Sequence, residues 1–161
     1  TGTLVNDALI GGKRLYMIST GTGLAPFASL IRDPETYEKF DNIILTHTCR
    51  DVAELDYGKE LVTALRDDPL IGELVDGRLT HFTSTTRETS PVMGRITTLI
   101  ENGDLFKALG TEPFNRENDR VMICGSMAML KDVKALVEKA GLKEGSNAEP
   151  ADFVVERAFV G

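Results

Sequence analysis

The chain has 161 residues, of which 42% are hydrophobic and 27% charged, and its formal net charge is −7. This length supports one sizeable core, and 15 glycines and six prolines are ordinary globular usage, which excludes collagen-like and disordered chains. The acidic balance disfavours a nucleic-acid partner, because such proteins need a lysine and arginine stripe against the phosphates.

In the first half of the chain, short apolar runs typical of strands alternate with helical patterns. We expect a strand over residues 14–19, then a glycine turn at 21–23, then a short helix over 25–31 with a proline in its first turn. A second strand over 42–49 is apolar enough to be buried on both faces, and a helix over 58–66 follows it.

The second half repeats this alternation. We expect a third strand over 78–84, a helix over 96–101, a fourth strand over 120–124, an amphipathic helix over 127–140 and a last strand over 153–156. The third strand alternates apolar and polar residues, which places it near a sheet edge. The predicted fold is therefore an α/β, open, doubly wound, five-stranded parallel sheet with helices on both faces.

Ligands of such sheets bind at the carboxyl ends of the strands. The loops there carry residues 20–23, Arg50, residues 86–87 and residues 124–126, which we expect along one rim. A glycine turn between strand and helix brings backbone N–H groups close to a phosphate. The run at 21–23 lacks the further glycine of the dinucleotide fingerprint, however, so close packing of helix against strand explains it equally well.

Arg50, Arg87 and Arg95 follow strands of an acidic domain. A lone arginine at such a position is most often a solvated charge. Three that converge suit bidentate binding of a phosphate monoester, such as the 2′-phosphate that separates NADP from NAD.

Other reactive side chains favour structural roles. Cys124 ends an apolar strand with no adjoining histidine, so a buried hydrophobe is a better interpretation than a nucleophile. His47 lies inside a strand and is interpreted as a core histidine, and the acidic groups at 51–54 and 67–68 as solvated turns, since their spacing fits no calcium loop.

The two cysteines and the hydropathy bear on location. Cys49 and Cys124 both end apolar runs and lie far apart in the sequence, which favours reduced thiols and a cytoplasmic location over a secreted disulfide framework. The histidines and cysteines lack zinc spacing, so we expect no metal. No apolar run approaches the roughly 20 residues that cross a bilayer, so we expect no membrane partner.

Six motifs in order resemble those of bacterial ferredoxin/flavodoxin–NADP reductases. They are Ser19-Thr-Gly-Thr-Gly-Leu-Ala-Pro26, His47-Thr-Cys-Arg50, Thr85-Thr-Arg-Glu88, Met93-Gly-Arg95, Cys124-Gly-Ser126 and Phe153-Val-Val-Glu-Arg-Ala-Phe-Val160. The resemblance spans the chain but concerns only the NADP(H)-binding half of such enzymes. It implies that residues 13–161 are this half, with a C-terminal flavin-covering tail, and that residues 1–12 close an FAD-binding barrel otherwise absent from the sequence. We therefore expect the chain alone not to be a competent reductase.

The resemblance implies hydride transfer between NADPH and FAD, and electron exchange with ferredoxin or flavodoxin. It implies nucleotide contacts from Thr20, Gly21, Thr22 and Gly23 at the pyrophosphate and nicotinamide, and from Arg50, Thr86, Arg87 and Arg95 around the 2′-phospho-AMP end. Near the reaction centre it implies roles for Cys124, with Gly125 and Ser126 beside it on the cofactor, and for Glu156. It also implies that Ala158 occupies the position where plant-type enzymes have a terminal tyrosine stacked on the flavin, and that Phe159 reaches toward the FAD adenine.

Two other functions stay open. An NADH-dependent reductase component of an oxygenase shares the architecture, but an NAD site usually offers a carboxylate and has no need for Arg87 together with Arg95. In a non-catalytic nucleotide-binding module, Cys124 and Glu156 would be inert, but the tail at 154–160 would then have no flavin to cover.

Overall fold

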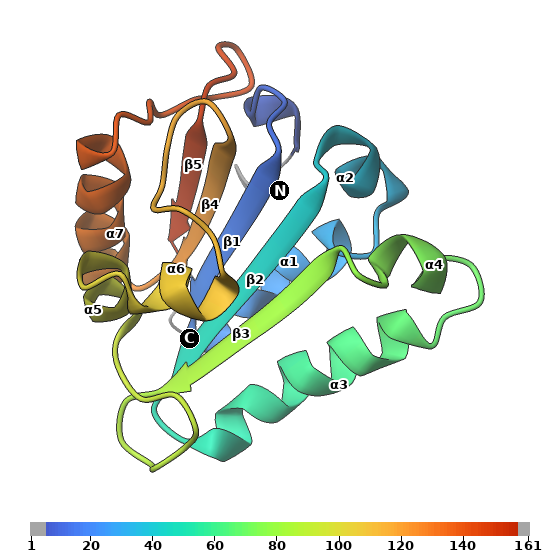
Figure 1. Ribbon diagram of the computed structural model, residues 1–161, viewed down its shortest axis with the longest axis vertical. Coiled ribbons are helices and arrows are strands. Elements are labelled where there is room, and N and C mark those ends of the chain that lie inside the picture. Colours follow the sequence, from blue (N-terminus) through green and yellow to red (C-terminus); the bar gives the residue numbers. More distant parts are fainter. Residues whose placement is uncertain (1–5, 158–161) are drawn as a thin grey trace.

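The computed structural model describes residues 6–157, and its centre is a wholly parallel sheet. The strands are β1 (Arg14–Thr20), β2 (Asn42–Cys49), β3 (Leu79–Thr85), β4 (Asp119–Gly125) and β5 (Phe153–Arg157). Their order across the sheet is β3-β2-β1-β4-β5 (Figure 1). The predicted five-stranded parallel sheet is confirmed, and β3 lies at an edge as its alternating pattern indicated.

The chain begins in the middle of this sheet. It moves outward from β1 to β3 and then returns to lay β4 against the free side of β1, so the strand order reverses between β1 and β4. The register places Ser19 of β1 opposite both His47 of β2 and Cys124 of β4. Because helices cover both faces of the sheet, the side chains of the middle strands are buried on both faces, which accounts for their near-continuous apolar runs.

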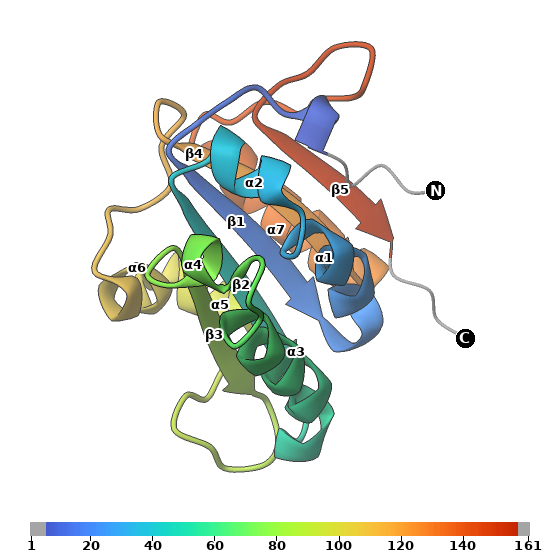
Figure 2. The ribbon, with the colours of Figure 1, turned by 90° about the vertical axis from the view of Figure 1, so that its right-hand side faces the viewer.

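Helices cover both faces of the sheet, as predicted. One face packs against α1 (Ala25–Leu30), α2 (Pro34–Lys39), α3 (Asp56–Arg66) and α4 (Gly72–Val75), and the other against α5 (Ile96–Glu101), α6 (Asp104–Leu109) and α7 (Met127–Lys139). Figure 2 is a view onto the first of these faces. Three 3₁₀ turns complete the elements: η1 (Asn6–Ala8), η2 (Gly21–Leu24) and η3 (Val52–Leu55).

Three short helices, α2, α4 and α6, were absent from the predicted elements. Each of the three has only four to six residues, so its hydrophobic period is a weak signal and its ends are the clearer mark. The Asp33 side chain accepts a hydrogen bond from the Glu35 N–H and Pro34 opens α2, while glycines in the left-handed conformation flank α6 at Gly103 and Gly110. In addition, α3 begins at Asp56, two residues before the predicted start.

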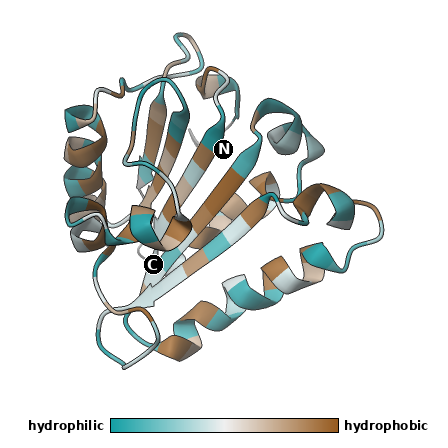
Figure 3. Cartoon of the chain, viewed as in Figure 1, coloured by the Kyte–Doolittle hydropathy of each residue, from teal (hydrophilic) through white to brown (hydrophobic). Residues whose placement is uncertain are grey.

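The core follows the hydropathy of the strands and of the inward helix faces (Figure 3). On α7, Leu130, Val133 and Val137 are buried, and the predicted stripe residue Leu136 is partly buried. Both cysteines are buried free thiols. Among residues 6–157, no helix has the length and apolar character that crossing a bilayer requires.

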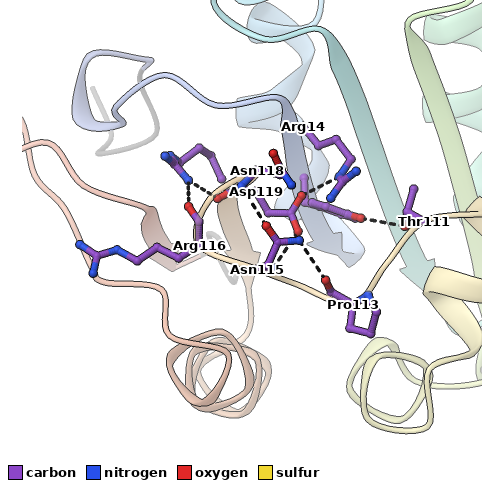
Figure 4. Close-up of polar contacts among 9 residues, drawn as sticks. Arg14, Thr111, Pro113, Asn115, Arg116, Asn118 and Asp119 are labelled. Carbon is purple, nitrogen blue, oxygen red and sulfur yellow. Dashed lines mark hydrogen bonds and ion pairs between the residues drawn. The ribbon is translucent and has the colours of Figure 1, made fainter.

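At the amino ends of β1 and β4, arginines are paired with buried carboxylates, and Figure 4 shows the pair of Arg14 with Asp119. Arg14 Nε lies 2.7 Å from Asp119 Oδ1, and the other Asp119 oxygen accepts the Asn115 N–H at 3.0 Å. Nearby, Asp152 lies 3.1 Å from Arg116 Nε and 3.7 Å from Arg120 Nη1. This edge of the sheet is thus held together by ion pairs and hydrogen bonds.

Residues 6–12, predicted to belong to another domain, pack onto this one where the structure describes them. Ala8 and Leu9 are buried in the same core cluster as β1, and Leu9 bridges Ala151. The packing therefore has no break at the predicted boundary after residue 12. The rest of that boundary prediction, residues 1–5, lies outside the described residues.

Candidate functional site

A cavity of about 490 Å³ opens at the carboxyl ends of the strands, where the arrowheads in Figure 1 point. The loops that follow β1, β2, β3 and β4 all contribute to it, as the rim prediction required. Its lining comprises Thr20, Gly21, Thr22, Thr48, Cys49, Arg50, Glu54, Thr86, Arg95, Ile96, Thr97, Ser126 and Met129. The site is therefore built by four loops and straddles the point where the strand order reverses, which is where open α/β sheets bind ligands.

The glycine turn after β1 has both of the properties weighed from the sequence. Gly23 packs closely: a Cβ atom there would lie 2.3 Å from the Cys124 carbonyl oxygen. Gly21 has a φ of 53°, and its missing side chain leaves open space on the cavity side. Close packing therefore explains Gly23, whereas Gly21 is the glycine that exposes backbone to a ligand.

The loop after β4 supplies a second close approach and a helix N-terminus. A Cβ atom on Gly125 would lie 2.5 Å from Thr20 Oγ1, so this glycine is needed for the two loops to meet. Ser126 caps α7 by accepting the Met129 N–H at 3.3 Å, and it lines the cavity. The N-terminus of the 13-residue helix α7 adds positive potential beside the cavity.

The three predicted arginines lie in neighbouring loops. The side chains of Arg50 and Arg95 line the cavity, and that of Arg87 does not. Arg87 still belongs to the same loop cluster, because its N–H donates to the Arg50 carbonyl at 3.0 Å. Within residues 6–157, no carboxylate lies within ion-pair distance of any of the three. Arg50 and Arg95 therefore bring positive charge to the cavity lining, and no described carboxylate forms an ion pair with either of them.

The acidic residues of this region have defined backbone partners. Asp51 and Glu54 form the capping box of η3, in which Glu54 Oε1 accepts the Asp51 N–H at 3.1 Å. Glu54 is also the carboxylate on the cavity lining. Among the described residues, no three histidine, cysteine or acidic side chains are grouped so that they could hold a metal ion.

Beneath the turn lie two side chains whose place in the site sequence reasoning missed. His47 is only 2% exposed, and its Nε2 atom lies 2.8 Å from the Gly21 carbonyl oxygen and 3.2 Å from Cys49 Sγ. Burial lowers the pKa of His47 and raises the pKa of the Cys49 thiol to about 11. Both side chains line a second cavity of about 420 Å³, which shares Gly21, Thr22 and Glu54 with the first. The prediction that could have revealed this role is the pairing of β1 with β2, because that pairing sets His47 beside the strand that leads into the turn.

Cys124 and Glu156 lie next to each other in register on β4 and β5. The Cys124 side chain is fully buried in the core and does not line the cavity, and burial raises the pKa of its thiol to about 11. A protonated, buried thiol agrees with the small-hydrophobe interpretation. Ala158 and Phe159 lie outside the described residues, so their assigned roles stay predictions.

Comparison with known proteins gives matches over most of the chain. The family described as "oxidoreductase NAD-binding domain" matches residues 17–135. The chain is 59% identical over 160 residues to the flavodoxin/ferredoxin–NADP reductase of Rhodobacter capsulatus. This match covers 99% of the present chain and 59% of that protein. It is 45% identical over 161 residues to the ferredoxin–NADP reductase of Pseudomonas aeruginosa, and covers 62% of it.

A solved structure matches the fold over the same extent. It is a ferredoxin–NADP⁺ reductase from Neisseria gonorrhoeae with bound FAD and NADP, with a TM-score of 0.84 and 30% identity, and the match covers 99% of this chain and 61% of that one. The chain therefore spans about three-fifths of the length of these relatives.

Proposed function

Because this chain belongs to the oxidoreductase NAD-binding domain family, we propose that it is the NADP(H)-binding part of a flavin-dependent ferredoxin/flavodoxin–NADP reductase. In that role it positions nicotinamide for hydride transfer to or from FAD. The observation that carries the proposal is the cavity at the carboxyl edge, which Arg50 and Arg95 line together with the glycine turn. The similarity to the reductases of R. capsulatus and P. aeruginosa supports it.

The arginine side of the cavity is assigned to the 2′-phosphate of NADP(H). Arg50, Arg95 and the neighbouring Arg87 have no carboxylate partner among the described residues, so their charge is available to an anion. A phosphate monoester carries up to two negative charges and accepts paired hydrogen bonds from planar guanidinium groups. Thr86, also on the lining, adds a hydroxyl at the same end.

The glycine side is assigned to the pyrophosphate and nicotinamide. Thr20, Gly21, Thr22 and Ser126 supply hydroxyl and backbone groups there, and α7 adds the positive potential of its N-terminus. Gly23 and Gly125 act indirectly, because their close packing brings the loops after β1 and β4 together.

Hydride chemistry belongs to the nicotinamide and flavin cofactors, so this chain contributes binding and orientation. Cys124 and Glu156 are assigned to shape the nicotinamide end, and Ala158 and Phe159 to the flavin side. Cys124 remains a protonated thiol near neutral pH, because burial raises its pKa to about 11, so it acts by its size and not as a base.

The experiment is a calorimetric titration of the chain with NADP⁺ and NAD⁺. We expect NADP⁺ to bind at least about tenfold more tightly, since each charge-assisted hydrogen bond to the 2′-phosphate is worth about 1.5–3 kcal/mol. Arg87→Ala and Arg50→Ala should each weaken the binding of NADP⁺ far more than the binding of NAD⁺. Arg32→Ala, an exposed arginine away from the cavity, is the matched control. Equal affinity for the two nucleotides would contradict the assignment and favour the NADH-dependent alternative.

The proposal extends to the complete protein. We expect it to hold FAD, to work in the cytoplasm and to exchange electrons with ferredoxin or flavodoxin. The buried free thiols of Cys49 and Cys124 support a reducing compartment. NADPH-driven reduction of each purified carrier by the complete protein tests the activity and distinguishes the two partners.

A further inference from the structure

We infer that His47 is a positioning residue of the nucleotide site: its neutral imidazole donates from Nε2 to the Gly21 carbonyl and so sets the backbone of the η2 turn. The inference rests on the proposed function, because it concerns how that site is shaped. His47 is assigned no contact with a nucleotide, since its ring lies under the turn.

The geometry defines the tautomer. Nε2 of His47 lies 2.8 Å from the Gly21 oxygen, and a carbonyl oxygen only accepts, so the hydrogen must be on Nε2. Nδ1 is then a lone pair, and it has no hydrogen-bond partner among the described residues. Burial lowers the pKa of His47, which keeps the ring neutral near pH 7.

The Gly21 carbonyl is an effective place to hold the turn. In a trans peptide, the N–H of Thr22 is antiparallel to the carbonyl of Gly21, so orienting one orients the other. Gly21 has a φ of 53° and open space where a side chain would be, so no side chain of its own holds its backbone in this conformation. The His47 hydrogen bond therefore acts on the residue that most needs an external restraint.

The same imidazole also connects the turn to the next loop. Cys49 Sγ lies 3.2 Å from the same Nε2 atom, whose single hydrogen is directed at the Gly21 carbonyl, and the thiol hydrogen points to the Glu54 carbonyl at 3.8 Å. The thiol keeps this hydrogen because burial raises its pKa to about 11. Gly21 and Glu54 both line the cavity, so His47 and Cys49 link two of its walls.

The elements around the ring agree with a neutral, closely packed imidazole. A Cβ atom on Gly58 of α3 would lie 3.5 Å from His47 Nδ1 and 3.5 Å from His81 Cε1, so α3 packs closely against both rings. Glu54 of η3 is the carboxylate that favours the charged ring. His81 of β3, and beyond it Lys59 and Arg66 of α3, are the basic groups of this region.

A purely structural histidine and a positioning histidine differ in what they do to ligands. Loss of core packing lowers the apparent affinity for every ligand of the site in proportion to the unfolded fraction. Loss of the turn restraint lowers the affinity for NADP⁺ and leaves the affinity for 2′-phospho-AMP nearly unchanged. The reason is that 2′-phospho-AMP lacks the nicotinamide half and depends on the arginine side of the cavity. The ratio of the two dissociation constants therefore separates the roles.

The test compares wild type, His47→Leu and His47→Gln by calorimetry, with thermal unfolding of each. Leu removes the donor, whereas Gln retains an N–H at a similar reach. We expect His47→Leu to raise the NADP⁺ dissociation constant about tenfold and that of 2′-phospho-AMP less than about threefold, and His47→Gln to restore most of the NADP⁺ affinity. Parallel weakening of the two ligands, or no weakening, overturns the inference.

A second measurement needs no variant and covers the case in which His47→Leu does not fold. Nitrogen-15 NMR of the wild-type imidazole should show an Nε2–H tautomer at pH 7 and above, and an Nδ1–H tautomer or a cationic ring at pH 7 overturns the inference. Failure of wild type to bind either nucleotide overturns the proposed function itself. Normal wild-type binding with insensitive variants overturns only the role of His47.

Discussion

The two edges of the sheet treat their arginines in opposite ways. At the amino ends of the strands, Arg14 pairs with Asp119, and Arg116 and Arg120 with Asp152. At the carboxyl ends, no carboxylate of residues 6–157 pairs with the arginines that follow β2 and β3. The chain has 25 acidic and 18 basic residues, so a shortage of carboxylates does not explain the difference between the edges. The amino edge uses charge for stability, and the carboxyl edge leaves it available to a ligand.

Chain direction explains why the carboxyl edge is the one proposed to bind a nucleotide. In a parallel sheet with helical crossovers, the helices run opposite to the strands, so their N-termini gather at the carboxyl edge. Their partial positive charge adds to that of the arginines there, as α7 does beside the cavity. Substitutions at the amino edge should therefore change stability, and substitutions at the carboxyl edge should change affinity.

The largest effect is expected at the amino edge from Asp119→Ala. The carboxylate is fully buried, and its removal leaves Arg14 without its partner and the Asn115 N–H without its acceptor. The free energy of unfolding should fall by about 3–5 kcal/mol, measured by urea denaturation. NADP⁺ affinity of the folded fraction should be unchanged. The double variant Arg14→Met with Asp119→Leu should recover part of the loss, and a double variant no more stable than the single one would contradict the ion-pair explanation.

At the carboxyl edge, Arg95→Ala should show the reverse pattern. The side chain is exposed and lacks a carboxylate partner among residues 6–157, so the free energy of unfolding should change by less than about 0.5 kcal/mol. NADP⁺ affinity should fall at least about tenfold, with little change for NAD⁺. Calorimetry and urea denaturation on one preparation measure both quantities. A stability loss comparable to that of Asp119→Ala would abolish the contrast between the edges.

Gly23→Ala is expected to affect both stability and affinity. A Cβ atom there would meet the Cys124 carbonyl at 2.3 Å, so the turn must move away from β4. Such overpacking costs about 1–3 kcal/mol, and the displaced turn should also bind NADP⁺ less well. Gly11→Ala, where nothing lies within 4 Å, is the control for the loss of glycine itself. Equal behaviour of the two variants in denaturation and titration would argue against a role for close packing.

The smallest effect concerns His81, within β3 between the two edges. Burial, helped by His47 and by Arg66 and Lys59, lowers its pKa from 6.5 to about 4. The unfolded chain thus binds more protons between these values, so stability is complete above pH 6.5 and declines as pH falls toward 4. The change should be on the order of 1 kcal/mol for this half-buried ring. His81→Phe should flatten the dependence of the free energy of unfolding on pH over pH 4–6.5. An unchanged slope would show that other groups cause the dependence.

Local patterns were sufficient for most of the framework. The runs that form the five strands, the edge position of β3 and the helix at 96–101 follow from hydrophobic period and turn residues alone. The rim could also be predicted, because any loop after a parallel strand lies at the carboxyl edge whatever the length of the crossover. Arg50, Thr86, Arg95 and Ser126 lie in such loops, and all four line the cavity.

Tertiary structure decided which of those rim residues meet and how. The sequence alone determined an α/β sheet with arginines and a glycine turn at one edge. It did not reveal that Gly23 packs on Cys124, that the Arg87 side chain lies off the cavity lining, or that His47 holds Gly21 across two strands. Local propensity depends on neighbours a few residues apart, whereas these contacts join residues 26 to 101 positions apart and exist only once β2 and β4 are aligned with β1.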